Sequence, residues 1–236
     1  MKTLLCIIAA CSVSVVGMAQ TTPSSSTPRS SIYVKGGLNL ANISIDDDGR
    51  VDDNKTLASF HVGLMADLPI GNFFAIQPSL LFTGKGTKWQ SGNSDDANYF
   101  KATTNPMYIE LPVNGVFKVP LAEGSSLFIG AGPYVAMGIA GKNKVEGKVL
   151  GVEYSRDESI EWSNDDPATG DEEDTGLGIM RRFDFGLNGT AGLQLNKFLI
   201  SVNYGHGLSK LQSGSDSDDD NKNKHRVWSL SVGFGL

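Results

Sequence analysis

The sequence has almost no cysteine, since Cys6 and Cys11 are the only two among 236 residues. Both fall within residues 1–19, which combine a lysine, an apolar stretch and a small-x-small site ending at Ala19. This pattern predicts a secretory signal peptide, so the mature chain is expected to contain neither a disulfide nor a reactive thiol. An alternative interpretation takes residues 8–11 as a lipobox, which would leave Cys11 as a lipid-modified N-terminus.

Long hydrophobic runs and an excess of basic charge are also missing. Beyond residue 19 there is no run of about 18 apolar residues, which excludes a transmembrane helix there. A membrane-spanning mature chain would then have to be a closed β-barrel, because only helices and barrels satisfy every backbone polar group in lipid. The net charge of −6 argues against nucleic acid as a partner. Residues 20–30 are rich in Ser, Thr and Pro and are expected to form a flexible lead-in.

What the sequence does contain is alternation with a period of two. In residues 183–195, Phe183, Phe185 and Leu187 alternate with Asp184, Gly186 and Asn188, as expected for a strand with one apolar and one polar face. The same pattern recurs eight times and predicts strands at 31–43, 57–69, 73–89, 105–119, 126–142, 181–195, 198–210 and 225–236. Repeated alternating segments near ten residues long are typical of outer-membrane barrels. The predicted fold is therefore an all-β, eight-stranded, antiparallel up-and-down transmembrane barrel spanning residues 31–236.

The connections between these strands alternate in length. Three are short and built from Pro, Gly or Asn, whereas the four others run to 40 residues and contain most of the 26 Asp and Glu residues. Short periplasmic turns on one side and long extracellular loops on the other are typical of transmembrane barrels. We therefore expect long acidic loops outside the cell, with residues 142–181 as the main candidate contact region.

The two faces of the predicted wall differ in the size of their side chains. The apolar face carries most of the Phe, Leu, Ile and Val, which would overfill the narrow interior of an eight-stranded barrel. We therefore expect this face to point outward into lipid and the polar face to point inward. The inward ionisable groups should form a salt-bridged network, because an unpaired buried charge is costly. This predicted network comprises Lys35, His61, Asp67, Glu110, Lys118, Arg182 and Asp184. The opposite orientation describes a secreted, lipocalin-like barrel that binds a small apolar ligand.

Four stretches of the chain resemble the PorT-like outer-membrane β-barrel family. They are "GGLNLANIS", "FFAIQPSLLFTGKG", "YIELPVNGVFKV" and "LFIGAGPYVAMGIAGK", and the terminal "WSLSVGFGL" resembles the strand that barrel-assembly machinery recognises. The resemblance covers about residues 31–236. It implies a small barrel in the outer membrane of a Gram-negative bacterium, and its motifs mark strands without a catalytic centre.

Catalytic and metal-binding patterns are weak. His206 and Ser209 lie three apart on a predicted strand and so face opposite sides, which argues against a lipid A-modifying enzyme. Two acidic stretches offer oxygen ligands for a divalent cation but fit no calcium-loop template. Their candidate ligands are Asp46, Asp48, Asp216, Asp218 and Asp220. No cofactor motif is present. We expect a monomer surrounded by outer-membrane lipid and lipopolysaccharide, with a structural or surface-interaction role and no open pore.

Overall fold

The computed structural model describes residues 30–43, 56–92, 96, 98–122, 124–149, 151–163, 179–209 and 224–236. The predicted signal peptide and all but the last residue of the predicted lead-in lie outside these ranges. In the described ranges, no helix has the length and apolar character needed to cross a membrane. The strands are β1 (Ser31–Ile43), β2 (Leu57–Pro69), β3 (Phe74–Gly84), β4 (Thr87–Ser91), β5 (Tyr99–Ala122), β6 (Ser125–Val149), β7 (Val152–Ser159), β8 (Glu161–Ser163), β9 (Ile179–Arg181), β10 (Phe183–Leu195), β11 (Phe198–Gly207) and β12 (His225–Gly235).

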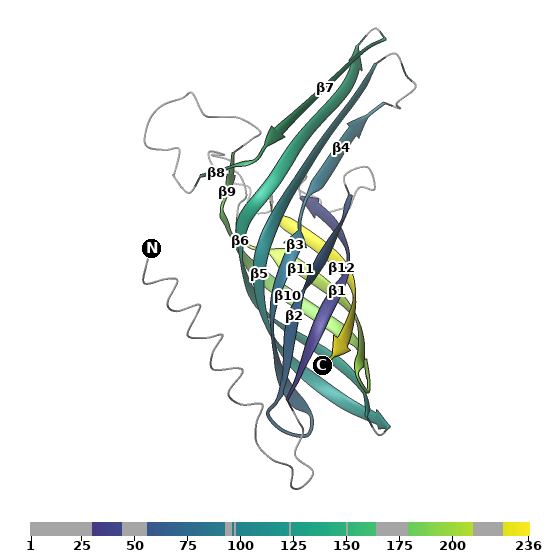
Figure 1. Ribbon diagram of the computed structural model, residues 1–236, viewed down its shortest axis with the longest axis vertical. Helices are drawn as coiled ribbons and strands as arrows, with labels where there is room; N and C mark the ends of the chain where they lie inside the picture. The colour runs from purple at the N-terminus through teal and green to yellow at the C-terminus, as the bar shows by residue number, and fades with distance from the viewer. Residues whose placement is uncertain are drawn as a thin grey trace.

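Eight of the strands form a closed ring. Antiparallel pairs run in the order β3-β2-β1-β12-β11-β10-β6, and the additional pairing of β5 with both β3 and β6 closes the wall. The last strand, β12, pairs with β1 over Tyr33–Ile43, so the two ends of the barrel domain lie side by side. Figure 1 shows the tilted strands of this barrel, with β4 and β7 at its upper end. The predicted eight-stranded antiparallel barrel is therefore confirmed.

Most predicted strand bounds agree with the structure, and the differences lie toward one rim. The predicted strand 73–89 is interrupted at Lys85 and Gly86. On both sides of this break, β3 and β4 pair with the same strand, β5, in one continuous register. The predicted loop 142–181 was wrong in part, because β6 continues to Val149 and turns back into β7. Gly151 permits this turn with its φ of 84°, a backbone conformation that suits glycine.

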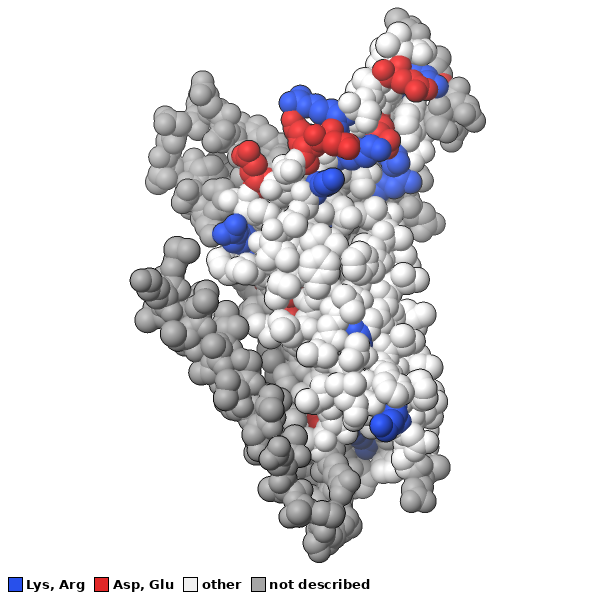
Figure 2. All heavy atoms as spheres, viewed as in Figure 1, with Lys and Arg blue, Asp and Glu red and all other residues white. Residues whose placement is uncertain are grey.

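The apolar face of the wall points outward, as predicted. Phe185 and Leu230 are 53% and 54% exposed, whereas Asp184, next to Phe185, is 1% exposed. Figure 2 shows a broad belt around the visible face of the barrel with almost no charged side chain at its surface. Such a belt would be unfavourable in water and is suited to hydrocarbon. The lipocalin-like alternative, which requires these side chains inside, is wrong.

A β-bulge divides β6 into two parts with opposite parity. Met107 pairs with Ala140 and Tyr108 with Gly138, so Ile139 is an extra residue on β6. Below the bulge the odd positions of β6 face outward, and above it the even positions do. Beyond the bulge, residues 140–149 of β6 pair with residues 99–107 of β5, and β4 and β7 flank them. We call these four segments the protruding sheet, because they extend past the rest of the barrel (Figure 1).

Candidate functional site

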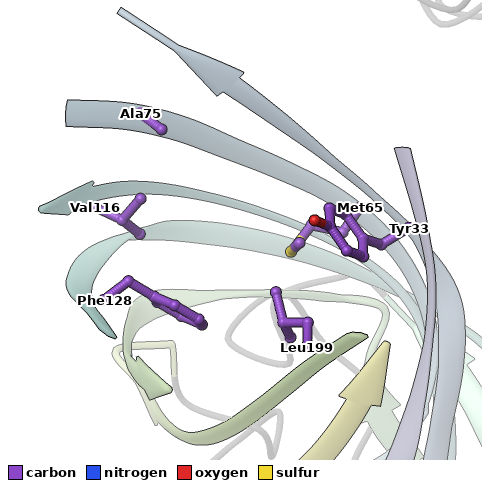
Figure 3. Close-up of a cluster of buried hydrophobic side chains, with 6 residues drawn as sticks. All are labelled: Tyr33, Met65, Ala75, Val116, Phe128 and Leu199. Atoms are coloured by element: carbon purple, nitrogen blue, oxygen red, sulfur yellow. The ribbon is translucent and has the colours of Figure 1, made fainter. Parts of the chain in front are cut away.

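Apolar side chains fill the interior at the end with the short turns. Figure 3 shows six of them reaching inward from the wall, on strands that begin or end at this rim. All are at most 2% exposed, and they are Tyr33, Met65, Ala75, Val116, Phe128 and Leu199. We call this group the apolar plug. Burial on this scale supplies a substantial hydrophobic contribution to stability and excludes water from this end.

An ion pair lies beside the apolar plug. The Lys118 ammonium contacts the Asp67 carboxylate, whose other oxygen accepts a hydrogen bond from Gln77 at 3.1 Å. Lys118 also donates to Gln194 Oε1 at 3.0 Å, and Gln194 donates to the Tyr33 hydroxyl at 2.8 Å. Because each charged group has a partner, the network meets the requirement that buried charges be paired.

The middle of the barrel holds a hydrogen-bonded network centred on His61. Its Nδ1 lies 2.7 Å from Asn39 Oδ1, and its Nε2 lies 2.9 Å from Ser231 Oγ. Asn203 donates to Ser231 at 2.9 Å and accepts a hydrogen bond from Lys35 Nζ at 3.3 Å. This network therefore joins β1, β2, β11 and β12 across the interior.

The upper interior contains a cation shared by two carboxylates. Lys85 Nζ lies 2.5 Å from Glu110 Oε2 and 2.8 Å from Asp184 Oδ2. The ring of Tyr134 is 4.0 Å from the same ammonium, and its hydroxyl donates to Asp184 at 3.2 Å. Ser209 donates to the second Asp184 oxygen at 2.6 Å. We call these five residues the upper ion cluster.

Trp162, on β8, covers the upper ion cluster from the loop side. Its ring packs edge-on against Tyr108 at 5.5 Å, and a Cβ added at Gly138 would lie 2.2 Å from it. Ile160 and Met180 are buried against the same indole. Between this cap and the apolar plug, a polar cavity of about 40 Å³ remains, lined in part by Lys35 and His61. A cavity of that volume and polarity can hold a few water molecules.

Six of the seven residues of the predicted interior network lie inside the barrel. Lys35, His61, Asp67, Glu110, Lys118 and Asp184 all lie on the inner face and take part in the contacts described above or line the cavity. Arg182 differs, because its side chain is exposed. It shares the inward parity of Asp184, but it lies in a bend before β10 begins, where strand alternation does not apply.

Several interior residues were missed by the sequence argument. Lys85 follows the inward parity of Thr83, which could have revealed it, but it lies between two glycines at the strand break. His225 is the first residue of the predicted strand 225–236 and was not assigned to the interior, yet it is 1% exposed and its Nε2 lies 3.2 Å from the Tyr108 hydroxyl. Trp162 comes from a segment with no strand pattern, and no sequence signal indicated its position.

The candidate enzymatic and metal-binding residues give no assembled centre among the described residues. His206 and Ser209 differ in direction, because Ser209 is buried against Asp184 and His206 contacts Tyr204. In the part of the chain that the structure describes, no three metal-binding side chains gather. The weak metal candidates Asp46, Asp48, Asp216, Asp218 and Asp220 lie outside the described residues.

The protruding sheet presents two different faces. Its inner side continues the inner wall of the barrel and carries Trp89, Phe100, Val145 and Tyr154, with Trp89 and Phe100 packed edge-to-face at 5.3 Å. Its outer side carries mainly charged residues. A hollow of about 420 Å³ near the tip is lined by Tyr99, Lys101, Glu146, Gly147, Lys148, Glu153, Tyr154 and Ser155.

Comparison with known proteins gives a family and several similar structures. The model of the outer membrane protein beta-barrel domain matches residues 18–213. The structure of Ail, the attachment invasion locus protein of Yersinia pestis, is 19% identical with a TM-score of 0.35; the alignment covers 88% of this chain and 97% of Ail. Neisserial surface protein A is 12% identical with a TM-score of 0.39, over 89% of this chain and all of that protein. No curated protein sequence matches. Because the family model covers most of the chain, this protein belongs to the outer membrane protein β-barrel domain family.

Proposed function

We propose that this integral outer-membrane barrel is a surface-interaction protein and that the protruding sheet is its contact element. The observation that carries the proposal is the free edge of β7. All eight side chains of Val152–Ser159 are exposed, and within the described residues this strand pairs only with β6. An open strand edge offers unpaired backbone donors and acceptors, to which an extended segment of another molecule can add.

The inner face of the protruding sheet supports the same role. Tyr154 lies over Gly147, where an added Cβ would meet its ring at 2.3 Å, and remains 43% exposed. Val152, near the tip, is 72% exposed. Aromatic and apolar side chains beside an open edge give a contact area in addition to backbone hydrogen bonds. The barrel beneath provides the rigid scaffold on which such a surface is held.

The filled interior supports a binding role over transport or catalysis. The apolar plug, the Asp67–Lys118 pair, the network centred on His61, the upper ion cluster and the Trp162 ring fill successive levels of the interior, so we propose that the protein forms no open pore. We also propose that it catalyses no reaction on lipid, because His206 and Ser209 lie on opposite faces of the wall and cannot act as a base and nucleophile pair.

A finer family assignment belongs to the same proposal. The stretches that resemble PorT-like barrels coincide with β1, β3, β5 and β6, and the terminal motif coincides with β12. We propose on this basis that the chain is a PorT-like member and that assembly machinery recognises β12. Phe234 supports the second point, since it packs against Phe198 at 5.3 Å and presents an aromatic side chain near the end of the strand.

Photo-crosslinking on intact cells tests the contact role. A benzoylphenylalanine at Val152 or at Tyr154 is expected to give discrete adducts with a protein or polysaccharide of the cell's surroundings. The same group at Leu230, on the lipid-facing wall, is the matched control and is expected to label lipid. Adducts are separated by electrophoresis and identified by mass spectrometry. If both sheet positions give the same products as Leu230, the protruding sheet is not a contact element.

A further inference from the structure

The two outermost strands of the protruding sheet, β4 and β7, differ in how open their free edges are. β4 is only partly exposed, and its first residue, Thr87, forms an isolated bridge with Thr56. In the described part of the chain β7 pairs with β6 alone, and all of its residues are exposed. Figure 1 shows β7 as the last strand on its side of the protruding sheet. The edge of β7 is therefore the one that is open to a further strand.

The segment of the chain that begins with β7 is strongly acidic. Residues 152–178 contain ten Asp and Glu residues and a single basic residue, Arg156. Figure 2 shows carboxylates beyond the uncharged belt, at the end of the molecule that carries the protruding sheet. Because unlike charges attract and like charges repel across an interface, this composition favours a partner with basic side chains over an acidic partner.

Two carboxylates of β7 lie on its outer face. Glu153 pairs in register with Lys148 of β6, and Asp157 pairs in register with Lys144. Glu153 lies 3.2 Å from the Lys148 ammonium, yet its side chain is 78% exposed and can accept a second partner. Among the described residues, no cation lies within ion-pair distance of Asp157. The two carboxylates are four residues apart, about 13 Å along the strand, so two basic side chains at the same spacing on a neighbouring strand can meet both.

The inner face of β7 has a different chemistry. Arg156 and Glu158 pair with each other at 2.5 Å, so their charges compensate. The other inner-face side chains of the strand, Val152 and Tyr154, are exposed and largely apolar. A strand added to β7 would therefore meet carboxylates on its outer side and mainly apolar side chains on its inner side. Alternation with a period of two lets one extended segment satisfy both faces.

We propose that the edge of β7 binds an extended segment of another protein in which basic residues alternate with apolar ones. The backbone of this segment pairs with β7, its basic side chains reach Glu153 and Asp157, and its apolar side chains lie beside Val152 and Tyr154. A second copy of β7 is disfavoured as the partner, because two such edges would place acidic side chains beside acidic side chains. This inference rests on the contact role proposed above and names the chemistry of the partner.

Binding of a short synthetic peptide to the purified, folded barrel tests this inference. The probe is a fluorescent peptide of alternating Lys and Val, and its binding is measured by anisotropy with the protein in phosphatidylcholine nanodiscs, whose lipid has no net charge. The wild-type protein is expected to bind this probe about tenfold more tightly than the peptide in which Glu replaces Lys. Glu153→Gln/Asp157→Asn is expected to weaken binding about tenfold. Asp96→Asn, in the connection between β4 and β5, is the matched control and is expected to leave binding unchanged.

A second probe separates strand pairing from simple charge attraction. Methylation of every peptide nitrogen keeps the charges of the Lys and Val peptide but removes its backbone donors, and is expected to weaken binding about tenfold. Equal binding of the methylated and unmethylated probes overturns the inference, and so does equal binding of the Lys and Glu peptides or undiminished binding by the double variant. A retained mobility difference between heated and unheated samples in electrophoresis shows that each variant is folded.

The outcome also distinguishes this inference from the contact role on which it rests. If the Lys and Val peptide does not bind, but benzoylphenylalanine at Val152 or Tyr154 still gives discrete adducts on intact cells, the partner has another chemistry. The inference is then overturned and the contact role stands. If the peptide does not bind and both positions give only the products seen at Leu230, both proposals fail.

Discussion

The two ends of the barrel interior stabilise their buried charges in different ways. At the short-turn end, apolar side chains fill the space and one ion pair, Asp67 with Lys118, lies beside them. At the loop end, Lys85 is enclosed by two carboxylates and a tyrosine ring, with Trp162 above. The lower end is stabilised mainly by apolar burial, which tolerates change in one polar group. The upper end depends on one cation, so its stability should be concentrated in Lys85.

Removing the shared cation should therefore have the largest effect. Lys85→Met leaves the Glu110 and Asp184 carboxylates buried without a counter-charge, which is expected to cost roughly 3–5 kcal/mol of unfolding free energy. Urea unfolding of the protein in lipid vesicles measures this change. The triple variant Lys85→Met/Glu110→Gln/Asp184→Asn should recover most of the loss. If the single variant is as stable as the wild type, the upper ion cluster is not a stabilising element.

Truncating a side chain of the apolar plug should cause the second-largest loss of unfolding free energy. Phe128→Ala removes a fully buried ring and leaves a cavity between Val116 and Leu199, at a cost of about 3 kcal/mol. The control is Phe185→Ala on the lipid-facing wall, where bilayer lipid can fill the space and a much smaller loss is expected. The same vesicle unfolding assay compares the two. Equal losses would show that the plug contributes no more than an ordinary lipid-facing ring.

Removing the cation of the lower end should cost less than removing Lys85. Lys118→Met leaves a single carboxylate, Asp67, which keeps its hydrogen bond from Gln77, so the expected loss is about 2 kcal/mol. Lys118→Arg preserves the charge and is the matched control. The comparison between the two ends is contradicted if Lys118→Met destabilises the barrel more than Lys85→Met does.

The smallest expected loss of unfolding free energy is at the Trp162 ring, which covers the upper ion cluster. Gly138→Ala places a methyl group in the space that the Trp162 ring occupies, so the indole must move away from Tyr108. Losing this edge-on contact is expected to cost about 1 kcal/mol and to shift tryptophan fluorescence toward that of a more hydrated indole. The fluorescence of Trp89 and Trp228 is removed beforehand by Trp→Phe replacement at both positions. An unshifted spectrum would show that Trp162 does not depend on the space at Gly138.

The same division between the ends explains what the sequence could predict. Near the short turns, each strand has one face in lipid and one in the interior, so parity identifies Lys118 and Asp67 from the sequence alone. At the loop end, the interior is completed by residues outside continuous strands. Lys85 lies at a strand break, Ser209 follows the end of β11, and Trp162 lies on the three-residue strand β8, outside the eight strands of the ring. Parity cannot place Ser209 or Trp162, because it applies only along a continuous strand, whereas it does place Lys85, since β3 and β4 pair with β5 in one register.

The protruding sheet was missed for a related physical reason. Segments such as "KATTN" and "NKVEGKV" lie beyond the lipid belt, where neither face meets hydrocarbon and alternation is no longer required. Arg182 shows the opposite error, since strand parity does not apply to this residue, which lies just before β10 begins. The eight membrane-spanning strands were therefore predictable, whereas their extensions and end residues depend on contacts that the sequence pattern does not encode.

The extra residue at Ile139 has a consequence for how this surface can change during evolution. Deleting that one codon would restore uniform alternation along β6, and Gly138 and Ala140 would keep the partners they already have on β5, so every later residue would stay on its present face. Inserting or deleting one residue elsewhere in the strand without a compensating bulge would instead turn Lys142, Lys144 and Lys148 toward the barrel axis and Val145 and Val149 toward the outer side. The bulge is thus the position of β6 at which a length change of one amino acid leaves both faces of the exposed sheet intact.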